Sequence, residues 1–418
     1  MRLEAKPTIF EFVGYRFEPA EKKIFFDYKV SFTSADFVLF TETINLPAVP
    51  ELEGLPKELY EKVLQDLHLA LGISYYKLYC SKKIKTGYVF SQEEANFWND
   101  FYEKGLGEFF YRNKLNPAIF PGFKSVKNKV CKNYRLEKNG KFLLGIGGGK
   151  DSVVASELLK NYGANFSTVF IQTQKESLLV DKMLTQIGVE SFKIKRHLDE
   201  KIFDEAVGYY TGHIPISGVY AFLGILSCIF YGYSYFVVAN EFSSNFGNVK
   251  YKGRTVNHQW SKSSEFETSF QDYVRKFITP DVFYFSLIRP FYEIRIAEMF
   301  AKMENYLYTF SSCNNNFKIN LAKNPSTGSG QEKLWCGHCA KCVFVFLMLS
   351  PFLPKEKLIS IFGKNIFQSE EALGNLRDIL GFGKIKPFDC VGTPEEAKVA
   401  FYMARETFKD DMAGKAFL

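Results

Sequence analysis

Residues 142–162 constrain the fold of this chain more than any other stretch. They read FLLGIGGGKDSVVASELLKNY, a short apolar run followed by three glycines and then by apolar residues at helical spacing. The pattern predicts a buried strand, a tight turn and the start of a helix. Because the backbone N–H groups of such a turn and of the helix start face the same point, the stretch predicts a binding site for an anion.

The side chains of the turn indicate which anion it binds. The turn consists of six residues, Gly147, Gly148, Gly149, Lys150, Asp151 and Ser152. Lysine and serine suit a phosphate group, whereas the carboxylate of Asp151 suits it only if a divalent cation such as Mg²⁺ lies between them. The plain alternative is a glycine turn without a ligand.

Two common nucleotide-binding patterns do not fit the turn. The pattern G-x-x-x-x-G-K-[ST] fails because Leu144 occupies the first glycine position and Asp151 follows the lysine. The pattern G-x-G-x-x-G fails in both registers. The turn instead resembles the S-G-G-x-D-S motif of the PP-loop ATP pyrophosphatases, with Gly147 in place of the leading serine. This resemblance implies a domain that splits ATP into AMP and pyrophosphate while it adenylates a substrate.

The composition favours a folded chain with an anionic partner. The chain has 418 residues, a net charge of +7 and a pI near 8.7, which suit a nucleotide, an acidic metabolite or RNA. No polybasic run of five residues occurs, so the charge does not indicate nucleic acid, and we expect no nucleic-acid partner. Residues 216–240 carry no charge, but Gly232, Ser234 and several tyrosines interrupt them. We therefore predict a core helix and a core strand there, and no membrane insertion.

The order of predicted elements divides the chain into two domains. Residues 1–135 predict an α+β domain, with a small antiparallel sheet within 8–46 and helices at 58–79 and 92–111, the second capped by Ser91. Residues 136–418 predict an α/β domain with a parallel sheet, because strand and helix patterns, including a helix at 199–207, alternate up to residue 240. A helical C-terminal region follows, with helices over 343–380 and a last helix capped by Thr393.

Polar side chains crowd residues 241–295, directly after a predicted core strand. They include five candidate catalytic residues, Glu241, His258, Lys262, Glu265 and Arg289. The ordinary interpretation is an exposed polar loop. However, ligands of parallel sheets bind at the carboxyl ends of the strands, and the glycine turn and Asn240–Glu241 occupy the same edge. We therefore predict a substrate-binding loop, in which the lone His258 could equally be a structural residue.

Four cysteines form a candidate metal site. Cys336, Cys339 and Cys342 are spaced by two residues in a tight turn, and Cys313 lies upstream. Four thiols at this spacing suit a tetrahedral structural zinc ion. The alternatives are His338 in place of one cysteine, an iron–sulfur cluster, or free thiols of which two are redox-active. The remaining cysteines are scattered, so we expect no disulfide framework: Cys80, Cys131, Cys228 and Cys390.

Several runs, spread over nearly the whole chain, resemble one family. They are GIGGGKDS, ANEFSSNFGN, TVNHQWSKSSEFE, RPFYEIRIAEMF, SSCNNNF and WCGHCAKCVFVF. The family is that of the UDP-N-acetyl-α-D-muramoyl-L-alanyl-L-glutamate epimerases of bacterial peptidoglycan synthesis. This resemblance implies a cytoplasmic isomerase that uses ATP and magnesium to invert the terminal L-glutamate of UDP-N-acetylmuramoyl-L-alanyl-L-glutamate. It also implies that a glutamate carboxylate is adenylated before the α-carbon is inverted.

Inversion at the α-carbon needs acid–base groups on both of its faces, or one mobile group. Adenylation removes the carboxylate charge, so that a modest base can take the α-proton. The candidates are His258, Glu241, Lys262 and Glu265. Arg289 is a candidate clamp for a substrate carboxylate, and Cys313 competes as an acid–base group if it binds no metal.

Two other functions stay open for the sequence alone. One is a PP-loop nucleotide-modifying enzyme, such as a tRNA thiolase or a 7-cyano-7-deazaguanine synthase, which the glycine turn and the cysteine cluster also suit. The other is a protein that binds a nucleotide without catalysis. The sequence does not determine the oligomeric state.

Overall fold

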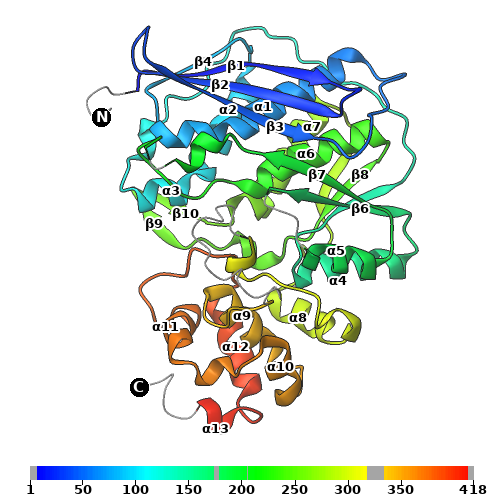
Figure 1. The fold of residues 1–418 in the computed structure, drawn as a ribbon, viewed down its shortest axis with the longest axis vertical. Coiled ribbons are helices and arrows are strands. Elements are labelled where there is room, and N and C mark those ends of the chain that lie inside the picture. Colours follow the sequence, from blue (N-terminus) through cyan, green and yellow to red (C-terminus); the bar gives the residue numbers. More distant parts are fainter. Residues whose placement is uncertain (1–6, 174–177, 205, 318–333, 413–418) are drawn as a thin grey trace.

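A nine-stranded sheet forms the centre of the chain (Figure 1). The computed structural model describes residues 7–173, 178–204, 206–317 and 334–412. The strand order is β11-β8-β5-β6-β7-β3-β2-β1-β4. The strands are β1 (Ile9–Glu18), β2 (Lys23–Ser31), β3 (Phe37–Asn45), β4 (Lys83–Thr86), β5 (Phe142–Gly145), β6 (Phe166–Gln172), β7 (Ser191–His197), β8 (Tyr235–Val238) and β11 (Phe283–Ser286). A separate hairpin consists of β9 (Val249–Tyr251) and β10 (Arg254–Val256).

Five neighbouring strands of this sheet are parallel: β11, β8, β5, β6 and β7. The interior strand β6 is buried along its whole length, which is typical of a parallel strand covered on both faces. The predicted parallel α/β arrangement is therefore confirmed. β11 was not predicted, because its residues lie in the segment that we predicted to be a polar loop.

The three N-terminal strands extend the parallel sheet. β1, β2 and β3 are antiparallel, as predicted, but β3 also pairs with β7, and Ile44 lies opposite Arg196. The predicted small sheet is therefore not separate, because β3 and β7 satisfy each other's backbone groups and leave no open edge between them. The division of the chain near residue 135 stays a prediction.

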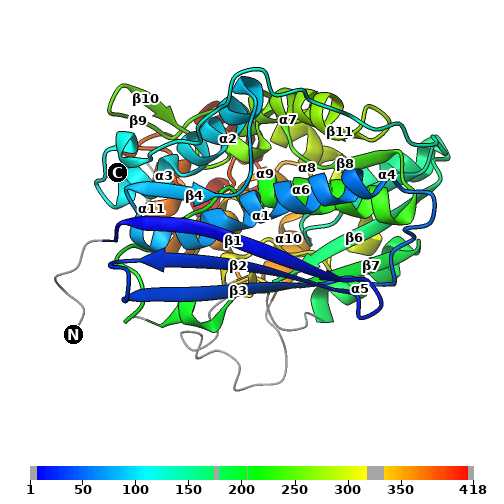
Figure 2. The same ribbon diagram turned by 90° about the horizontal axis from the view of Figure 1, so that it is seen from above.

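Helices cover both faces of the parallel part of the sheet and build two cores (Figures 1 and 2). Leu143 and Leu144, neighbours on β5, point into different cores, as the period of two along a strand requires. The helices of the first core are α1 (Lys57–Tyr79), α2 (Gln92–Gly105), α3 (Gly107–Arg112), α6 (Ile216–Tyr231) and α7 (Ser264–Phe277). Those of the second are α4 (Lys150–Tyr162), α5 (Leu178–Ile187), α8 (Glu293–Ala301), α9 (Ala340–Leu349), α10 (Lys355–Phe362), α11 (Glu370–Ile379) and α12 (Pro394–Ala404).

The uncharged stretch at 216–240 forms the core helix α6 and the core strand β8, as predicted. The buried residues of α6 lie all around the helix, which packs against α1. Among the described residues, no helix is long and apolar enough to cross a membrane.

Three predicted elements differ from the observed ones. Residues 264–277 form α7, whose Phe266, Phe270 and Val274 are buried at helical spacing between the polar residues that suggested a loop. The helix predicted at 199–207 is, within the described residues, only the 3₁₀ turn Glu200–Phe203, which Asp199 caps. The helix predicted at 92–111 breaks at Leu106 into α2 and α3.

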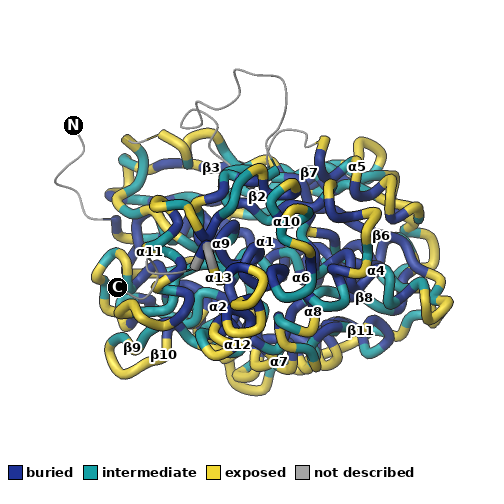
Figure 3. Tube along the Cα trace, turned by 90° about the horizontal axis from the view of Figure 1, so that it is seen from below, coloured by how far each residue is buried: buried dark blue, intermediate teal, exposed yellow. Residues whose placement is uncertain are grey.

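The helix caps and the helical C-terminal region are confirmed. Ser91 and Thr393 both form capping boxes, the first on α2 and the second on α12. α10 and α11 lie within the predicted helical range 343–380, and α9 begins three residues before it, at Ala340. Figure 3 shows that buried segments run through the middle of the molecule and that exposed residues lie mostly along its rim.

Candidate active site

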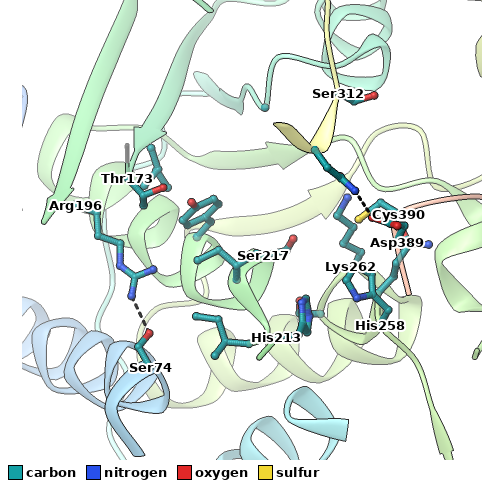
Figure 4. Close-up of a pocket in the computed structure, with 18 of the residues that line it drawn as sticks. Ser74, Thr173, Arg196, His213, Ser217, His258, Lys262, Ser312, Asp389 and Cys390 are labelled. Carbon is teal, nitrogen blue, oxygen red and sulfur yellow. Dashed lines mark hydrogen bonds between the residues drawn. The ribbon is translucent and has the colours of Figure 1, made fainter. Parts of the chain in front are cut away.

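A cavity of about 1230 Å³ lies at the carboxyl ends of the parallel strands (Figure 4). It is lined by Gly145 at the end of β5, by Thr173 after β6 and by Asn240 after β8. Ligand pockets commonly measure roughly 300–1,000 Å³, so this cavity has room for a nucleotide and a second ligand. The glycine turn and Asn240 line the same cavity, as the position of both at one sheet edge predicted.

The glycine loop, residues 147–152, has the backbone of an anion site. Gly148 has a φ of +90°, which a side chain at this position would make unfavourable. α4 begins at Lys150, and no side chain caps its N-terminus. The first N–H groups of α4 are therefore available to a ligand in the cavity. Ser152 turns its hydroxyl back and donates to the carbonyl of Gly149 at 3.0 Å.

A second segment supplies a hydroxyl next to the glycine loop. The backbone N–H of Ser311 donates to the carbonyl of Gly148 at 3.0 Å, which fixes the segment against the loop. Ser312 follows and lines the cavity (Figure 4). A Cβ placed on Gly149 would lie 3.6 Å from the Cβ of Ser312. A hydroxyl is thus present beside the loop even though Gly147 stands where the related motif has serine.

Three carboxylates meet beside the glycine loop. Asp151, Glu241 and Glu293 each bring an oxygen within 4.8 Å of the others. Lys150 is buried, with Nζ 2.5 Å from Asp151 and in contact with Glu293. Burial raises the pKa of Glu241 and of Glu293, and the nearby charge of Asp151 raises both further. Three oxygen ligands with unfavourable mutual repulsion fit a divalent cation, which would relieve that repulsion.

The C-terminal helix α12 is anchored to this carboxylate group. One oxygen of Glu396 accepts from the backbone N–H of Glu293 at 2.7 Å, and the other accepts from the hydroxyl of Ser243 at 2.6 Å. The same side chain closes the capping box of α12 with Thr393. The C-terminal region therefore holds Glu293 in place at the start of α8.

A cationic group surrounds a cysteine on another wall of the cavity. His258, Lys262 and Cys390 all line the cavity (Figure 4), and the thiol of Cys390 interacts electrostatically with both His258 and Lys262. Although burial opposes charge here, Cys390 and Glu108 together raise the pKa of His258 to about 9. Burial also opposes the charge of Lys262, but Cys390 and Glu241 hold its pKa above the usual range. Both groups are therefore protonated at neutral pH.

Glu108 of α3 orients His258. Its Oε2 accepts from Nδ1 of His258 at 2.5 Å, and Nδ1 of His213 lies 3.8 Å from the same oxygen. Burial and the charge of His258 lower the pKa of His213 to about 3, so His213 is neutral. These three side chains also resemble a metal-binding group, but the 2.5 Å contact is a hydrogen bond that leaves no room for an ion between the two atoms.

Three predicted catalytic residues do not line the cavity: Glu241, which belongs to the carboxylate group, Glu265 and Arg289. Glu265 lies in the first turn of α7 with 59% of its side chain exposed, and its carboxylate pairs with Lys104 at 2.6 Å. The guanidinium of Arg289 is occupied by Glu267, by the hydroxyl of Ser244 and by two backbone carbonyls. It braces the segment that carries Glu241 and Lys262, and it has no donors left for the predicted carboxylate clamp. The structure thus brings His258 and Lys262 to the cavity and Glu241 to the carboxylate group.

The four predicted cysteines meet in space. The Sγ atoms of Cys313, Cys336, Cys339 and Cys342 lie within 4.8 Å of one another, with 3.7 Å between Cys336 and Cys342 and 3.4 Å between Cys339 and Cys342. Sulfurs bound to zinc at about 2.3 Å lie roughly 3.8 Å apart at the corners of a tetrahedron, so the cluster fits zinc. An iron–sulfur cubane attaches each sulfur to a different iron and needs wider spacing.

The alternative ligand His338 does not join this cluster. About half of its side chain is exposed, and its Nδ1 lies 3.1 Å from the carbonyl of Cys336 instead of beside the thiols. Cys313 is one of the four clustered thiols and does not line the cavity, which disfavours the acid–base role considered for it.

Comparison with known proteins identifies the family. Residues 1–287 match the family model of the MurL N-terminal domain, and residues 309–417 match that of the MurL C-terminal domain. The chain belongs to the MurL family. A UDP-N-acetyl-alpha-D-muramoyl-L-alanyl-L-glutamate epimerase of Xanthomonas oryzae pv. oryzae is 35% identical over 382 residues, which cover 90% of this chain and 82% of the relative. A protein of the same name from Micromonospora sp. is 31% identical over 402 residues, 95% of this chain and 87% of the relative. As a member of the MurL family, the chain is an isomerase.

Sequence reasoning missed two residues of the cavity wall of this MurL-family chain, Cys390 and His213, and the residue that orients His258, Glu108. Cys390 was counted among the scattered cysteines, and Glu108 and His213 were not considered. No local pattern marks them, because they come from the loop before α12, from α3 and from the segment before α6. Only Cys390 itself could have suggested a functional residue, because it is a single cysteine in the segment after α11.

Proposed function

We propose that the chain uses ATP to epimerise the terminal L-glutamate of UDP-N-acetylmuramoyl-L-alanyl-L-glutamate, which supplies a D-glutamate-containing peptidoglycan precursor in the cytoplasm. The names of the relatives support the substrate. The observation that carries the ATP-dependent step is that one cavity is lined both by the glycine loop and by the group of His258, Lys262 and Cys390. An activation site and an acid–base site thus share one space.

The glycine loop supports a PP-loop type of ATP site. Its backbone N–H groups, together with Lys150, suit the pyrophosphate part of ATP, and the hydroxyl of Ser312 suits the position of the missing motif serine. Asp151, Glu241 and Glu293 would hold Mg²⁺. The cation would neutralise the phosphate charges as the bond to pyrophosphate breaks.

The proposed reaction has three steps. An oxygen of the glutamate α-carboxylate attacks the α-phosphorus of ATP, and pyrophosphate leaves. The resulting anhydride carries no carboxylate charge, so a base in the cavity takes the α-proton, and a donor returns a proton to the opposite face. Water then cleaves the anhydride to give AMP and the D-glutamate product. Binding of the whole UDP-sugar is compatible with a cavity of about 1230 Å³.

We also propose that the four-cysteine cluster holds a structural zinc ion. Three of its members, Cys336, Cys339 and Cys342, surround the start of α9, and Cys313 immediately follows the Ser311–Ser312 segment at the glycine loop. A bound ion would therefore fix α9 to that segment. The role of this ion would be structural, because four cysteines fill its coordination positions and none of them lies in the cavity wall.

The test of the proposed function is an assay in deuterium oxide with UDP-N-acetylmuramoyl-L-alanyl-L-glutamate, ATP and Mg²⁺. We expect AMP and pyrophosphate, deuterium at the glutamate α-carbon and D-glutamate in the chiral analysis. AMP without deuterium would refute the epimerisation. No AMP would refute the ATP-dependent step and would favour the deazaguanine or tRNA substrates of other PP-loop enzymes.

A matched pair of variants tests the glycine loop in the same assay. Asp151→Asn removes one carboxylate from the proposed cation site, and we expect AMP formation to fall by at least about 100-fold. Asp272→Asn removes a carboxylate on α7 that pairs with Arg275 outside the cavity, and we expect it to match the unmodified protein. Equal activity of the two variants would contradict the proposed ATP site.

A further inference from the structure

The loop before α12 presents Cys390 to the cavity at a point where two protonated side chains meet (Figure 4). The thiol is half-buried, lines the same cavity as His258 and Lys262, and interacts electrostatically with both. Lys341 of α9 adds a third positive charge. An environment of this kind stabilises the thiolate and makes the sulfur a base at neutral pH.

The charges that face Cys390 come from several elements. They are His258, Lys262, Lys341, Lys386 and Asp389. Burial by itself would raise the pKa of the thiol, but Lys262, Lys341 and His258 hold it well below the usual value for cysteine. Asp389 is the one negative group among them, and Nδ2 of Asn314 donates to its carboxylate at 2.8 Å.

Cys390 is a cavity group that can accept a proton. His258 and Lys262 already carry protons, because their pKa values lie above neutrality. Glu241 belongs to the carboxylate group beside the glycine loop, where a cation would occupy it. The thiolate of Cys390 lies between two cations. It has a free lone pair and does not belong to the proposed cation site.

A buried acceptor beside the thiol points independently to a ligand. Gln259 lines the cavity and is 2% exposed, and its Oε1 has no hydrogen-bond partner. Its Nε2 donates to the carbonyl of Val391 at 3.2 Å, which ties the Cys390 loop to the segment of His258 and Lys262. An unpaired buried acceptor is costly, so a ligand N–H at this wall would stabilise the site. The amide N–H of an alanyl-glutamate peptide lies one bond from the α-carbon and has the required chemistry.

We propose that Cys390 is a catalytic residue that exchanges the α-proton of the activated glutamate, and that Glu108 positions His258 to keep the sulfur in its thiolate form. The proposal rests on the proposed epimerase function. In the step, the Cα–H bond breaks and an S–H bond forms, while the C–H electron pair moves into the enolate of the acyl adenylate. A donor on the opposite face supplies the proton of the new Cα–H bond, and Cys390 loses its proton to solvent before the next cycle.

Two readouts on the full-length protein separate this proposal from the proposed function. The first is exchange of labelled pyrophosphate into ATP in the presence of the dipeptide substrate, which reports adenylation alone. The second is deuterium incorporation at the glutamate α-carbon. If the unmodified protein shows neither signal, the proposed function fails, and the proposal about Cys390 fails with it.

The variants Cys390→Ala and Cys390→Ser test the thiol. We expect pyrophosphate exchange within about threefold of the unmodified protein and deuterium incorporation lower by about 10³-fold. Cys131→Ala is the matched control, because Cys131 is exposed and lies outside this cavity, and both of its readouts should be unchanged. Deuterium incorporation within tenfold of the unmodified protein in either Cys390 variant overturns the proposal. Loss of both readouts in both variants also overturns it, since that result assigns Cys390 to the fold or to adenylation.

The pH profile of deuterium incorporation tests the positioning role of Glu108. Glu108→Gln removes the charge that supports protonated His258, so the thiolate loses stabilisation and the acidic limb of the profile should move up by about one pH unit. A merely structural role would lower the rate at every pH without moving that limb. An unmoved limb therefore contradicts the positioning role.

Discussion

The buried ion pair between Glu42 and Arg196 is expected to stabilise the junction of the N-terminal strands with the parallel sheet. Glu42 lies on β3 and Arg196 on β7, the two strands that join in antiparallel pairing. Nε of Arg196 lies 2.5 Å from Oε1 of Glu42, and its NH2 donates to Oε2 at 3.3 Å and to Oγ of Ser74 at 3.0 Å. The side chain of Arg196 is 1% exposed and that of Glu42 is fully buried. Glu42→Gln keeps the shape and removes the charge.

The magnitude follows from the burial of both partners. Two unit charges about 4 Å apart interact by roughly 4 kcal/mol at an effective dielectric constant of 20. Removing one partner of a buried pair costs about 3–5 kcal/mol, because the other charge stays buried without compensation. A glutamine at position 42 keeps one acceptor for the guanidinium, so we expect a loss of about 3 kcal/mol in the free energy of unfolding.

Urea denaturation followed by tryptophan fluorescence measures this loss. The control is Glu11→Gln, which breaks the exposed pair of β1 with Lys85 of β4 and should cost less than about 1 kcal/mol. The double variant Glu42→Leu with Arg196→Met replaces the pair by apolar side chains and should regain most of the stability. A loss below 1 kcal/mol for Glu42→Gln, or a double variant less stable than the single one, would refute the reasoning.

Three further predictions concern the cysteine cluster, the glycine loop and the dependence of stability on pH. Cys336→Ser should reduce bound zinc, measured by elemental mass spectrometry, from one ion per chain to well below one, while His338→Ala should leave it unchanged because that imidazole does not face the thiols. Gly148→Ala should weaken ATP binding at least tenfold in calorimetry because the residue has a φ of +90°, whereas Gly147→Ser should keep it because a side chain there meets nothing within 4 Å. Burial lowers the pKa of His68 to about 4, so the protein should be most stable above pH 6.5 and lose about 3 kcal/mol as the pH falls through 4. In denaturation curves at several pH values, His68→Gln should lack this component, and an unchanged pH profile in that variant would contradict the assignment.

The local elements of the site could be predicted from the sequence. The strand, glycine turn and helix at 142–162, the cap at Ser91 and the four-cysteine cluster each depend on residues within a few positions, or on a spacing that one ligand type demands. The position of the glycine loop and Asn240 at the same edge of the sheet could also be predicted, because the carboxyl ends of parallel strands lie at one edge. These signals survive in a single sequence because the interactions behind them are short in range.

The group formed by Cys390, His258 and Glu108 could not be predicted. Cys390, His258 and Glu108 come together because α3, the segment before α7 and the loop before α12 pack around the same sheet edge. The same packing turned Glu265 outward to Lys104 and enclosed Arg289 in carbonyl and carboxylate contacts, so two residues of suitable chemistry are occupied elsewhere.

The sequence by itself determined the strand, turn and helix at 142–162, the two helix caps and the four-cysteine cluster, and with them the candidate residues for an anion and a metal. Only the tertiary structure decided that the N-terminal strands continue the parallel sheet and that a cysteine in the C-terminal region lies between His258 and Lys262. The physical reason is that backbone propensity, capping and ligand spacing act within a turn or two of chain. Charge, burial and proton affinity depend instead on neighbours that the strand order brings together from positions far apart in the sequence.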